Sequence, residues 1–146
     1  MRKWLWRWGP VAAWLIVIFM ASSIGTLPSL DHGMLENLMH WIGHLSEYAI
    51  LALVLLRALK NGQAFSWREV VLILIIAAIY GLSDEWHQTF VKGRSGELWT
   101  VGLDMAGALI GVVIGWWHQR TKASTNPNGR SSKHRINELP DQQVDA

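Results

Sequence analysis

The residues best suited to chemistry lie between Asp84 and Asp104, in the sequence DEWHQTFVKGRSGELWTVGLD. This stretch gathers acids, a histidine, a glutamine, a lysine and an arginine at the junction between two strongly apolar segments. Side chains of these types can transfer protons, bind anions or hold metal ions. Because ionisable groups are costly in hydrocarbon, such a cluster in a membrane protein predicts a functional site.

Polar residues also recur at helical spacing, so that each set shares one face of a helix. One face carries His40, His44 and Glu47, and another carries Tyr80, Asp84, His87 and Gln88, with Glu85 at its edge. Asp104 shares a face with Thr100 and with a GxxxGxxxG run formed by Gly107, Gly111 and Gly115. Small residues at this spacing let another helix approach closely, which predicts that Asp104 points to the packed side of its helix.

The three faces deliver polar groups to one depth, roughly two helical turns below the outer surface at about 1.5 Å per residue. The predicted polar site consists of His44, Glu47, Tyr48, Asp84, Glu85, His87, Gln88, Arg94 and Asp104. A buried structural hydrogen bond is the alternative role for Asp104. For Arg94 the alternative is an ion pair that neutralises one of the buried acids. Tyr48 is expected to anchor the cluster through its hydroxyl.

Four apolar blocks must position these side chains, and they cover Gly9–Ile24, Leu38–Leu59, Val70–Phe90 and Leu98–Trp117. Each is near the ~20 residues that span a bilayer, and a helix satisfies the backbone of such a segment in lipid. Most of the ten tryptophans lie near block ends, as in an aromatic belt at the headgroups. The alternative is that they form the core of a soluble bundle. We predict an all-α fold, an integral membrane four-helix bundle over residues 1–118.

The two ends of the chain need separate interpretations. The basic, then apolar, start is also typical of a signal peptide cleaved near Ser23, which is the alternative to a retained first helix. Residues 119–146 are polar and carry almost no apolar anchor, which predicts a disordered cytoplasmic tail. The absence of cysteine excludes disulfides and cysteine-based metal or nucleophile chemistry.

The lysines and arginines are distributed unevenly about the apolar blocks. Eleven lie near the N-terminus, around the linker between the second and third blocks, or in the tail, whereas Lys92 and Arg94 alone lie in the other two linkers. The positive-inside rule then places both termini in the cytoplasm and the polar cluster on the outer side. We therefore expect a multi-pass protein of the bacterial inner membrane whose polar site faces outwards.

Three motifs resemble those of VanZ-like membrane proteins. HLSEYAIL (residues 44–51) looks like their HxxEYxxL motif, DEWHQTFVKGR (residues 84–94) like DExxQxFxPGR, and DMAGALIG (residues 104–111) like D/NxxGxxxG. Two positions depart from the pattern: Lys92 stands where proline is usual, and Thr100 stands where many members have an acid. The resemblance implies a small integral membrane protein, in a family named for association with resistance to the glycopeptide teicoplanin.

Three functions fit the cluster. The first is binding of an anionic or amphiphilic envelope ligand, such as a lipid headgroup, a wall precursor or an amphiphilic antibiotic, with Arg94 recognising the anion. The second is a membrane-embedded hydrolase or transferase that acts on a lipid-linked substrate through His44, Glu47, Asp84 and His87. Metal could assist through these ligand types or through a pair formed by His40 and His44. The third is a proton or solute pathway, which the apolar inner halves of the helices disfavour in one protomer.

We predict the first of these functions, in a cell-envelope or antibiotic-resistance role, and the enzymatic alternative stays open. No cofactor and no bound metal are part of this prediction, since HExxH, GxSxG and phosphate-loop motifs are absent. The expected partners are the lipid bilayer and the envelope ligand, and a homo-oligomer stays open. Nucleic acid is not expected, because the basic residues have a topogenic distribution.

Overall fold

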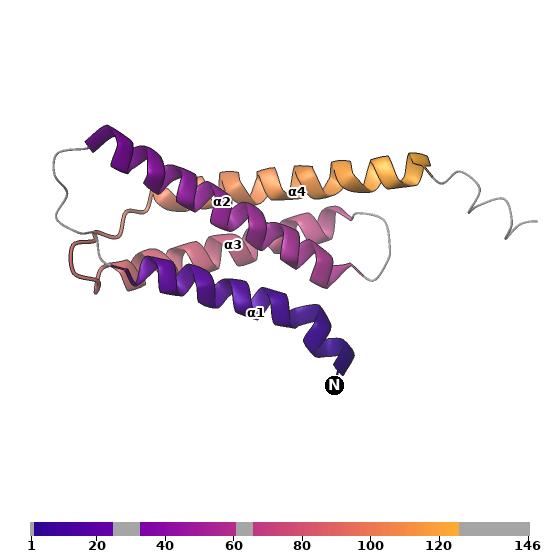
Figure 1. The fold of residues 1–146 in the computed structure, drawn as a ribbon, viewed down its shortest axis with the longest axis horizontal. Helices are drawn as coiled ribbons and strands as arrows, with labels where there is room; N and C mark the ends of the chain where they lie inside the picture. Colours follow the sequence, from indigo (N-terminus) through magenta and orange to yellow (C-terminus); the bar gives the residue numbers. More distant parts are fainter. Residues whose placement is uncertain (1, 25–32, 61–65, 126–146) are drawn as a thin grey trace, which may run out of the picture. The chain divides into compact units, whose positions relative to one another are not determined.

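The computed structural model describes residues 2–24, 33–60 and 66–125, which form four α-helices (Figure 1). The helices are α1 (Arg2–Ser22), α2 (Gly33–Leu59), α3 (Trp67–Gln88) and α4 (Thr100–Thr125). No strand occurs within these described ranges. Each helix contains a stretch that is long and apolar enough to cross a membrane, so the predicted all-α membrane four-helix fold is confirmed.

The chain divides into two compact units. Residues 1–115 form the first, which contains the whole predicted site. Residues from Trp116 onwards form the second, in which the Arg120 guanidinium lies over the Trp116 ring, 3.9 Å from its centroid. Helix α4 runs to Thr125, past the predicted end of the fourth block at Trp117. From position 126 onwards the predicted tail lies outside the described residues.

The start of α3 is fixed by a capping box. The Ser66 hydroxyl accepts a hydrogen bond from the Arg68 N–H, and the Glu69 carboxylate accepts one from the Ser66 N–H over 3.1 Å. These contacts satisfy backbone donors that the first turn of a helix leaves unpaired. The predicted site residues of α3 lie towards the opposite end of the helix, which finishes at Gln88.

Helix α1 begins at Arg2, well before the predicted first block, and it continues through Pro10. A proline inside a helix removes one backbone hydrogen bond, so these first turns gain from a partner outside the helix. The Arg7 guanidinium donates to the carbonyls of Ala58 and Leu59 at the end of α2, the second over 3.0 Å. The end of a helix leaves such carbonyls unpaired, and the contact therefore joins the start of α1 to the end of α2.

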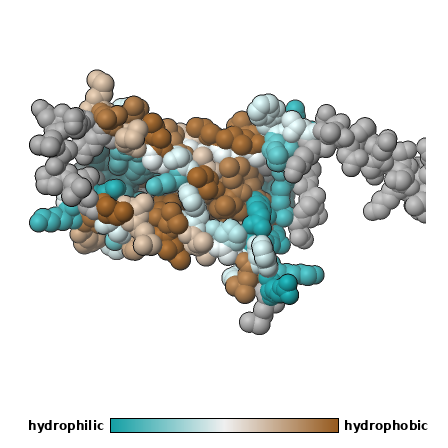
Figure 2. Space-filling model, in the orientation of Figure 1, coloured by the Kyte–Doolittle hydropathy of each residue, from teal (hydrophilic) through white to brown (hydrophobic). Residues whose placement is uncertain are grey.

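Apolar side chains in the first unit divide between a narrow core and a wide outer surface. Fully buried side chains include Ile18 of α1, Leu51 and Leu55 of α2, and Ile73 of α3. A larger number of big apolar side chains are exposed, and Figure 2 shows hydrophobic surface along the middle of the helices. Helices that are apolar on their outer sides are suited to lipid rather than to water.

Helix α4 packs against α2 through its glycine face. The close approaches are those of Gly107 to the Leu45 carbonyl, Gly111 to the Ala49 carbonyl and Gly115 to the Leu56 side chain. A Cβ at the first two positions would collide with the backbone of α2. Glycine alone permits this approach, and the contact turns the same face of α4, which carries Asp104, into the bundle.

We predict that Gly107→Ala destabilises the protein by about 1–3 kcal/mol, because the added methyl group meets backbone instead of a mobile side chain. Thermal unfolding of the purified protein in detergent measures the effect. Gly102→Ala is the matched control, since position 102 on the same helix faces open space. Equal unfolding temperatures for the two variants would contradict this account of the packing.

Candidate functional site

Four helix ends meet at one end of the bundle formed by residues 1–115 (Figure 1). They are the C-terminal ends of α1 and α3 and the N-terminal parts of α2 and α4. Polar residues that are far apart in the sequence are thereby gathered into one layer. The buried polar residues of this layer are Ser22, His44, Asp84, Glu85, Gln88, Thr100 and Asp104.

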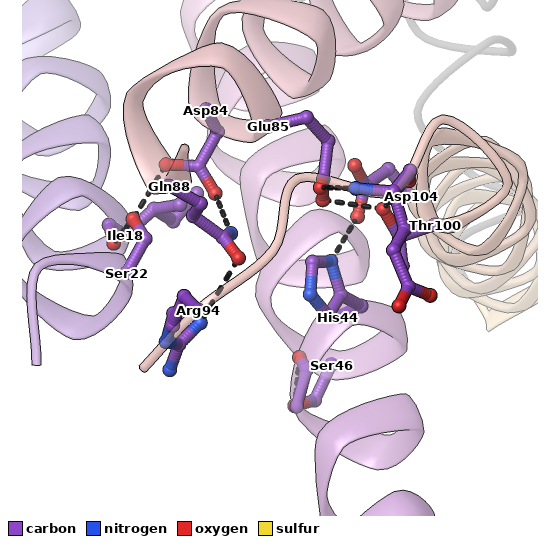
Figure 3. A network of polar contacts seen from close by, with 12 residues as sticks. Ile18, Ser22, His44, Ser46, Asp84, Glu85, Gln88, Arg94, Thr100 and Asp104 are labelled. Atoms are coloured by element: carbon purple, nitrogen blue, oxygen red, sulfur yellow. Dashed lines mark hydrogen bonds and ion pairs between the residues drawn. The ribbon is translucent and has the colours of Figure 1, made fainter. Parts of the chain in front are cut away.

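A chain of hydrogen bonds joins the loop after α3 to α1 (Figure 3). The Arg94 guanidinium donates to the Gln88 side-chain carbonyl over 3.2 Å, and the Gln88 amide donates to Asp84 Oδ2 over 3.0 Å. The Ser22 hydroxyl donates to Asp84 Oδ1 over 2.5 Å. Arg94 also donates to the Ile24 carbonyl over 3.1 Å. Both oxygens of Asp84 are therefore satisfied, and both by neutral donors.

Glycines shape the loop that carries Arg94. Gly93 has a φ of 83°, in the left-handed region that favours glycine. The Arg94 N–H donates to the Val91 carbonyl over 3.1 Å, which closes the turn. Further along, Gly96 lies so close to the Glu85 carbonyl that a Cβ would collide with it. The loop therefore folds back over the end of α3 and returns Arg94 to the polar layer.

A second network joins α2, α3 and α4 (Figure 3). His44 Nδ1 and Asp104 Oδ1 lie 2.8 Å apart, in a buried pair that links α2 to α4. The Glu85 carboxylate accepts hydrogen bonds from the Thr100 hydroxyl and, over 2.7 Å, from the Glu97 N–H. These contacts link the end of α3 to the start of α4.

Two buried oxygens of the layer have no hydrogen-bond partner within the described ranges: Asp104 Oδ2 and the Tyr48 hydroxyl. Tyr48 is fully buried, but its hydroxyl makes no hydrogen bond to the other residues of the layer. It therefore does not anchor the cluster in the way the sequence leads us to expect. Gly81 faces both atoms, and a Cβ there would lie 2.6 Å from Asp104 Oδ2 and 3.5 Å from the Tyr48 hydroxyl. Unpaired buried polar atoms are rare in folded proteins, and they distinguish this spot from the fully satisfied Asp84.

His87 takes a different direction from the other predicted site residues. Its Nε2 lies 3.0 Å from the Ser23 hydroxyl, and its ring stacks against that of Phe19 with centroids 4.4 Å apart. His87 therefore contacts the end of α1, and it belongs to neither of the two buried networks, although its spacing puts it on the same helix face as Asp84.

Two pockets open beside Arg94. The inner one, of about 140 Å³, includes Ser22, His44, Glu47 and Asp84 in its lining. The outer one, of about 440 Å³, includes Trp41, Trp99, Ser95 and Glu97. Both are lined by Met39, His40, Gln88 and Arg94. The half-buried Glu47 thus faces the inner pocket, and His40, whose ring centroid lies 4.5 Å from that of His44, stands between the two.

The buried acids of the site outnumber the ion pairs that they form. Asp84, Glu85 and Asp104 have relative exposures of only 6%, 3% and 1%, yet within the described residues the pair of His44 with Asp104 is the one ion pair. The alternative role of Arg94 as a counter-ion to a buried acid is not what the structure has, because its guanidinium donates to two neutral carbonyl groups. Arg94 lines both pockets, together with Glu47 and Asp84 in the inner one and Glu97 in the outer one.

Three donors in the networks are not predicted by the sequence: the hydroxyls of Ser22 and Thr100 and the Glu97 N–H. Thr100 does carry a signal, since it lies one turn before Asp104 on the same helix face. Ser22 carries none, because its contact with α3 depends on how α1 docks. The remaining predicted residues apart from His87 line a pocket or lie in the buried layer.

Comparison with protein families extends the likeness in the motifs to most of the chain. The family model described as VanZ/LLP1 matches residues 8–119, which include both networks and the lining of both pockets described above. A search of curated proteins and a search of solved structures gave no significant match.

We predict that Ser22→Ala destabilises the protein by about 1–3 kcal/mol, because it leaves a buried carboxylate oxygen of Asp84 without its donor. Thermal unfolding in detergent measures the loss. Ser83→Ala, at an exposed position one residue before Asp84, is the control. A Ser22 variant as stable as the Ser83 variant would show that this hydrogen bond does not hold α1 against α3.

Proposed function

Because the chain belongs to the VanZ/LLP1 family, we propose that it is a bacterial inner-membrane protein that binds the anionic group of an amphiphilic envelope ligand. Its character as a multi-pass membrane protein follows from the family and from the four apolar helices. The proposed orientation, with both termini in the cytoplasm, rests on the distribution of lysine and arginine. It puts the polar layer in the outer leaflet, where lipid headgroups, lipid-linked wall precursors and amphiphilic antibiotics are found.

The main support for this binding is that the Arg94 guanidinium is not paired with a carboxylate among the described residues. It lines both pockets, and within the described residues no carboxylate oxygen lies within 4.0 Å of it. Its acceptors are the neutral carbonyls of Gln88 and Ile24. A guanidinium has five donors and a planar shape that suits phosphate and carboxylate groups. The charge of Arg94 is therefore available to an anion that enters either pocket.

The lining of the outer pocket favours a ligand that is amphiphilic. The rings of Trp41 and Trp99 lie edge to face in its lining, with centroids 6.0 Å apart. Indole rings bind apolar groups while remaining at a polar interface. A ligand with an anionic group at Arg94 and an apolar portion against these rings would use both properties. Roles in the cell envelope and in glycopeptide resistance are part of this proposal.

The enzymatic alternative is favoured by one specific contact. His44 lines the inner pocket, and Asp104 holds its Nδ1 atom. A carboxylate that orients an imidazole in this way is the arrangement of a general base and its orienting group. In a hydrolase or transferase acting on a lipid-linked substrate, His44 would take that role with Glu47 and Asp84 nearby. His87, the fourth member of the set expected from the sequence, contacts Ser23 and Phe19 instead.

The proposed orientation can be tested by labelling. The chain has no cysteine, so a single cysteine at Gly33 reports on one end of α2 alone. We predict that an impermeant thiol reagent labels Gly33→Cys in intact cells, because the segment before α2 would be outside. Trp67→Cys, which lies exposed at the start of α3, is the opposite-side control and should be labelled only after the cells are opened. The reverse pattern would overturn the orientation.

We predict that Arg94→Gln weakens binding of short-chain phosphatidylglycerol by about 10- to 100-fold, since a hydrogen bond to a charged group contributes about 1.5–3 kcal/mol. Calorimetric titration of the purified protein measures the affinity, with zwitterionic phosphatidylcholine of the same chain length for comparison. Arg94→Lys should retain part of the affinity, because it keeps the charge but loses the planar donor set.

Lys92→Gln is the matched control, because Lys92 is an exposed cation two residues away that lines neither pocket. Its affinity should match that of the unchanged protein. Teicoplanin sensitivity of cells that produce each variant extends the test to an amphiphilic antibiotic. Equal affinity for the two lipids, together with no effect of Arg94→Gln on sensitivity, would count against the proposed binding.

A further inference from the structure

A second group of polar side chains lies buried where α2, α3 and α4 meet. His44 of α2, Glu85 of α3 and Asp104 of α4 each offer one ligand atom, and these atoms all lie within 4.8 Å of one another. All three residues are buried. We infer that these three side chains form a site for a divalent metal ion, with Zn²⁺ as the best match to one imidazole and two carboxylates.

The geometry is close to what coordination requires. Zinc binds histidine nitrogen and carboxylate oxygen at about 2.0–2.2 Å, so ligand atoms around one ion stand about 3–4 Å apart. Atoms already within 4.8 Å of one another reach that spacing through small side-chain rotations. Each ligand comes from a different helix, and the Thr100 hydroxyl and the Glu97 N–H hold the carboxylate of Glu85 in place. Such supporting contacts orient the ligands of metal sites.

The two unpaired oxygens supply an independent reason for a ligand at this spot. Asp104 Oδ2 is buried and unpaired within the described chain, although Oδ1 of the same carboxylate is held by His44. The Tyr48 hydroxyl is likewise buried and unpaired. Both lie near the same residue, Gly81, where a Cβ would stand only 2.6 Å from Asp104 Oδ2, so the absence of a side chain lets this carboxylate oxygen and the Tyr48 hydroxyl come together. A cation bound to Asp104, with a water molecule that reaches Tyr48, would satisfy both atoms.

Charge also favours a cation. Glu85 and Asp104 can bring two negative charges into the bundle, and within the described residues only Asp104 has an ion-pair partner, His44. The hydrogen bonds to Glu85 come from a neutral hydroxyl and a neutral backbone N–H. Uncompensated buried charge is strongly unfavourable, and a divalent ion would offset it.

This inference goes beyond the binding of an anion at Arg94 and does not depend on it. It departs from the sequence-based expectation of no bound metal. Its ligand set also differs from those that spacing suggested, because Glu85 and Asp104 replace His40, Glu47, Asp84 and His87 as partners of His44. His44 is common to both, and it also lines the inner pocket, so the ion would lie beside any group that enters there.

The test uses the full-length protein, purified in detergent without a histidine tag, stripped with chelator and titrated with ZnSO₄ alone. We expect about one zinc per chain by elemental analysis. The unfolding temperature should rise by about 5–10 °C when free zinc exceeds its dissociation constant a hundredfold. Asp104→Asn and Glu85→Gln should each weaken zinc binding by at least about tenfold.

Asp84→Asn is the matched control, because Asp84 is a buried acid of the same layer whose two oxygens are both occupied. It should keep the zinc affinity of the unchanged protein. Should the Asp104 and Glu85 variants fail to fold, Co²⁺ added to the unchanged protein gives the decisive reading: the intense visible absorption of a four-coordinate site with nitrogen and oxygen ligands. No stoichiometric zinc and no such absorption would overturn the inference, as would an equal loss of zinc affinity in Asp84→Asn.

Discussion

The cost of burying carboxylates in a membrane bundle is the constraint on which the rest of this structure depends. Asp84, Glu85 and Asp104 are withdrawn from water in helices whose outer surfaces suit lipid. Each needs hydrogen-bond donors to remain there, and none finds all of them on its own helix. Asp84 takes one from α1, Glu85 takes its two from the start of α4 and the segment before it, and Asp104 pairs with α2. The acids therefore act as cross-links at one end of a bundle whose remaining core is apolar packing.

Gln88 separates Arg94 from the buried acid Asp84, so that the guanidinium stays available to a ligand even though the site contains several carboxylates. Its amide donates to Asp84 and its carbonyl accepts from Arg94, so a neutral group stands between the carboxylate and the guanidinium. A direct ion pair would have cancelled the charge of Arg94 and removed most of its attraction for a ligand. The same arrangement ties the orientation of Arg94 to the docking of α1, since Ser22 and Ile24 lie at the two ends of the hydrogen-bonded chain.

Local patterns account for the parts of this architecture that belong to single helices. The presence of four apolar helices, the polar face of α3 and the glycine face of α4 all follow from residue spacing, and Gly107 and Gly111 do contact the backbone of α2. Spacing does not give the rotation of one helix against another. His87 and Asp84 share a face by sequence, yet His87 contacts Phe19 and Ser23 while Asp84 enters the buried layer. The contact of Ser22 with Asp84 could not be predicted for the same reason, since it forms only when α1 packs against α3.

The position of Arg94 at the pockets, relative to the buried acids Glu85 and Asp104, links the two proposals physically. Arg94 stands beside both pockets, whereas Glu85 and Asp104 lie in the buried layer that His44 joins to the inner pocket. Without a cation, the buried acids would repel an anionic group that moved from the outer pocket inwards. A divalent ion at His44, Glu85 and Asp104 would offset the charge of these two acids and so remove their repulsion. The depth to which an anionic ligand enters would then depend on metal, while its capture at Arg94 would not.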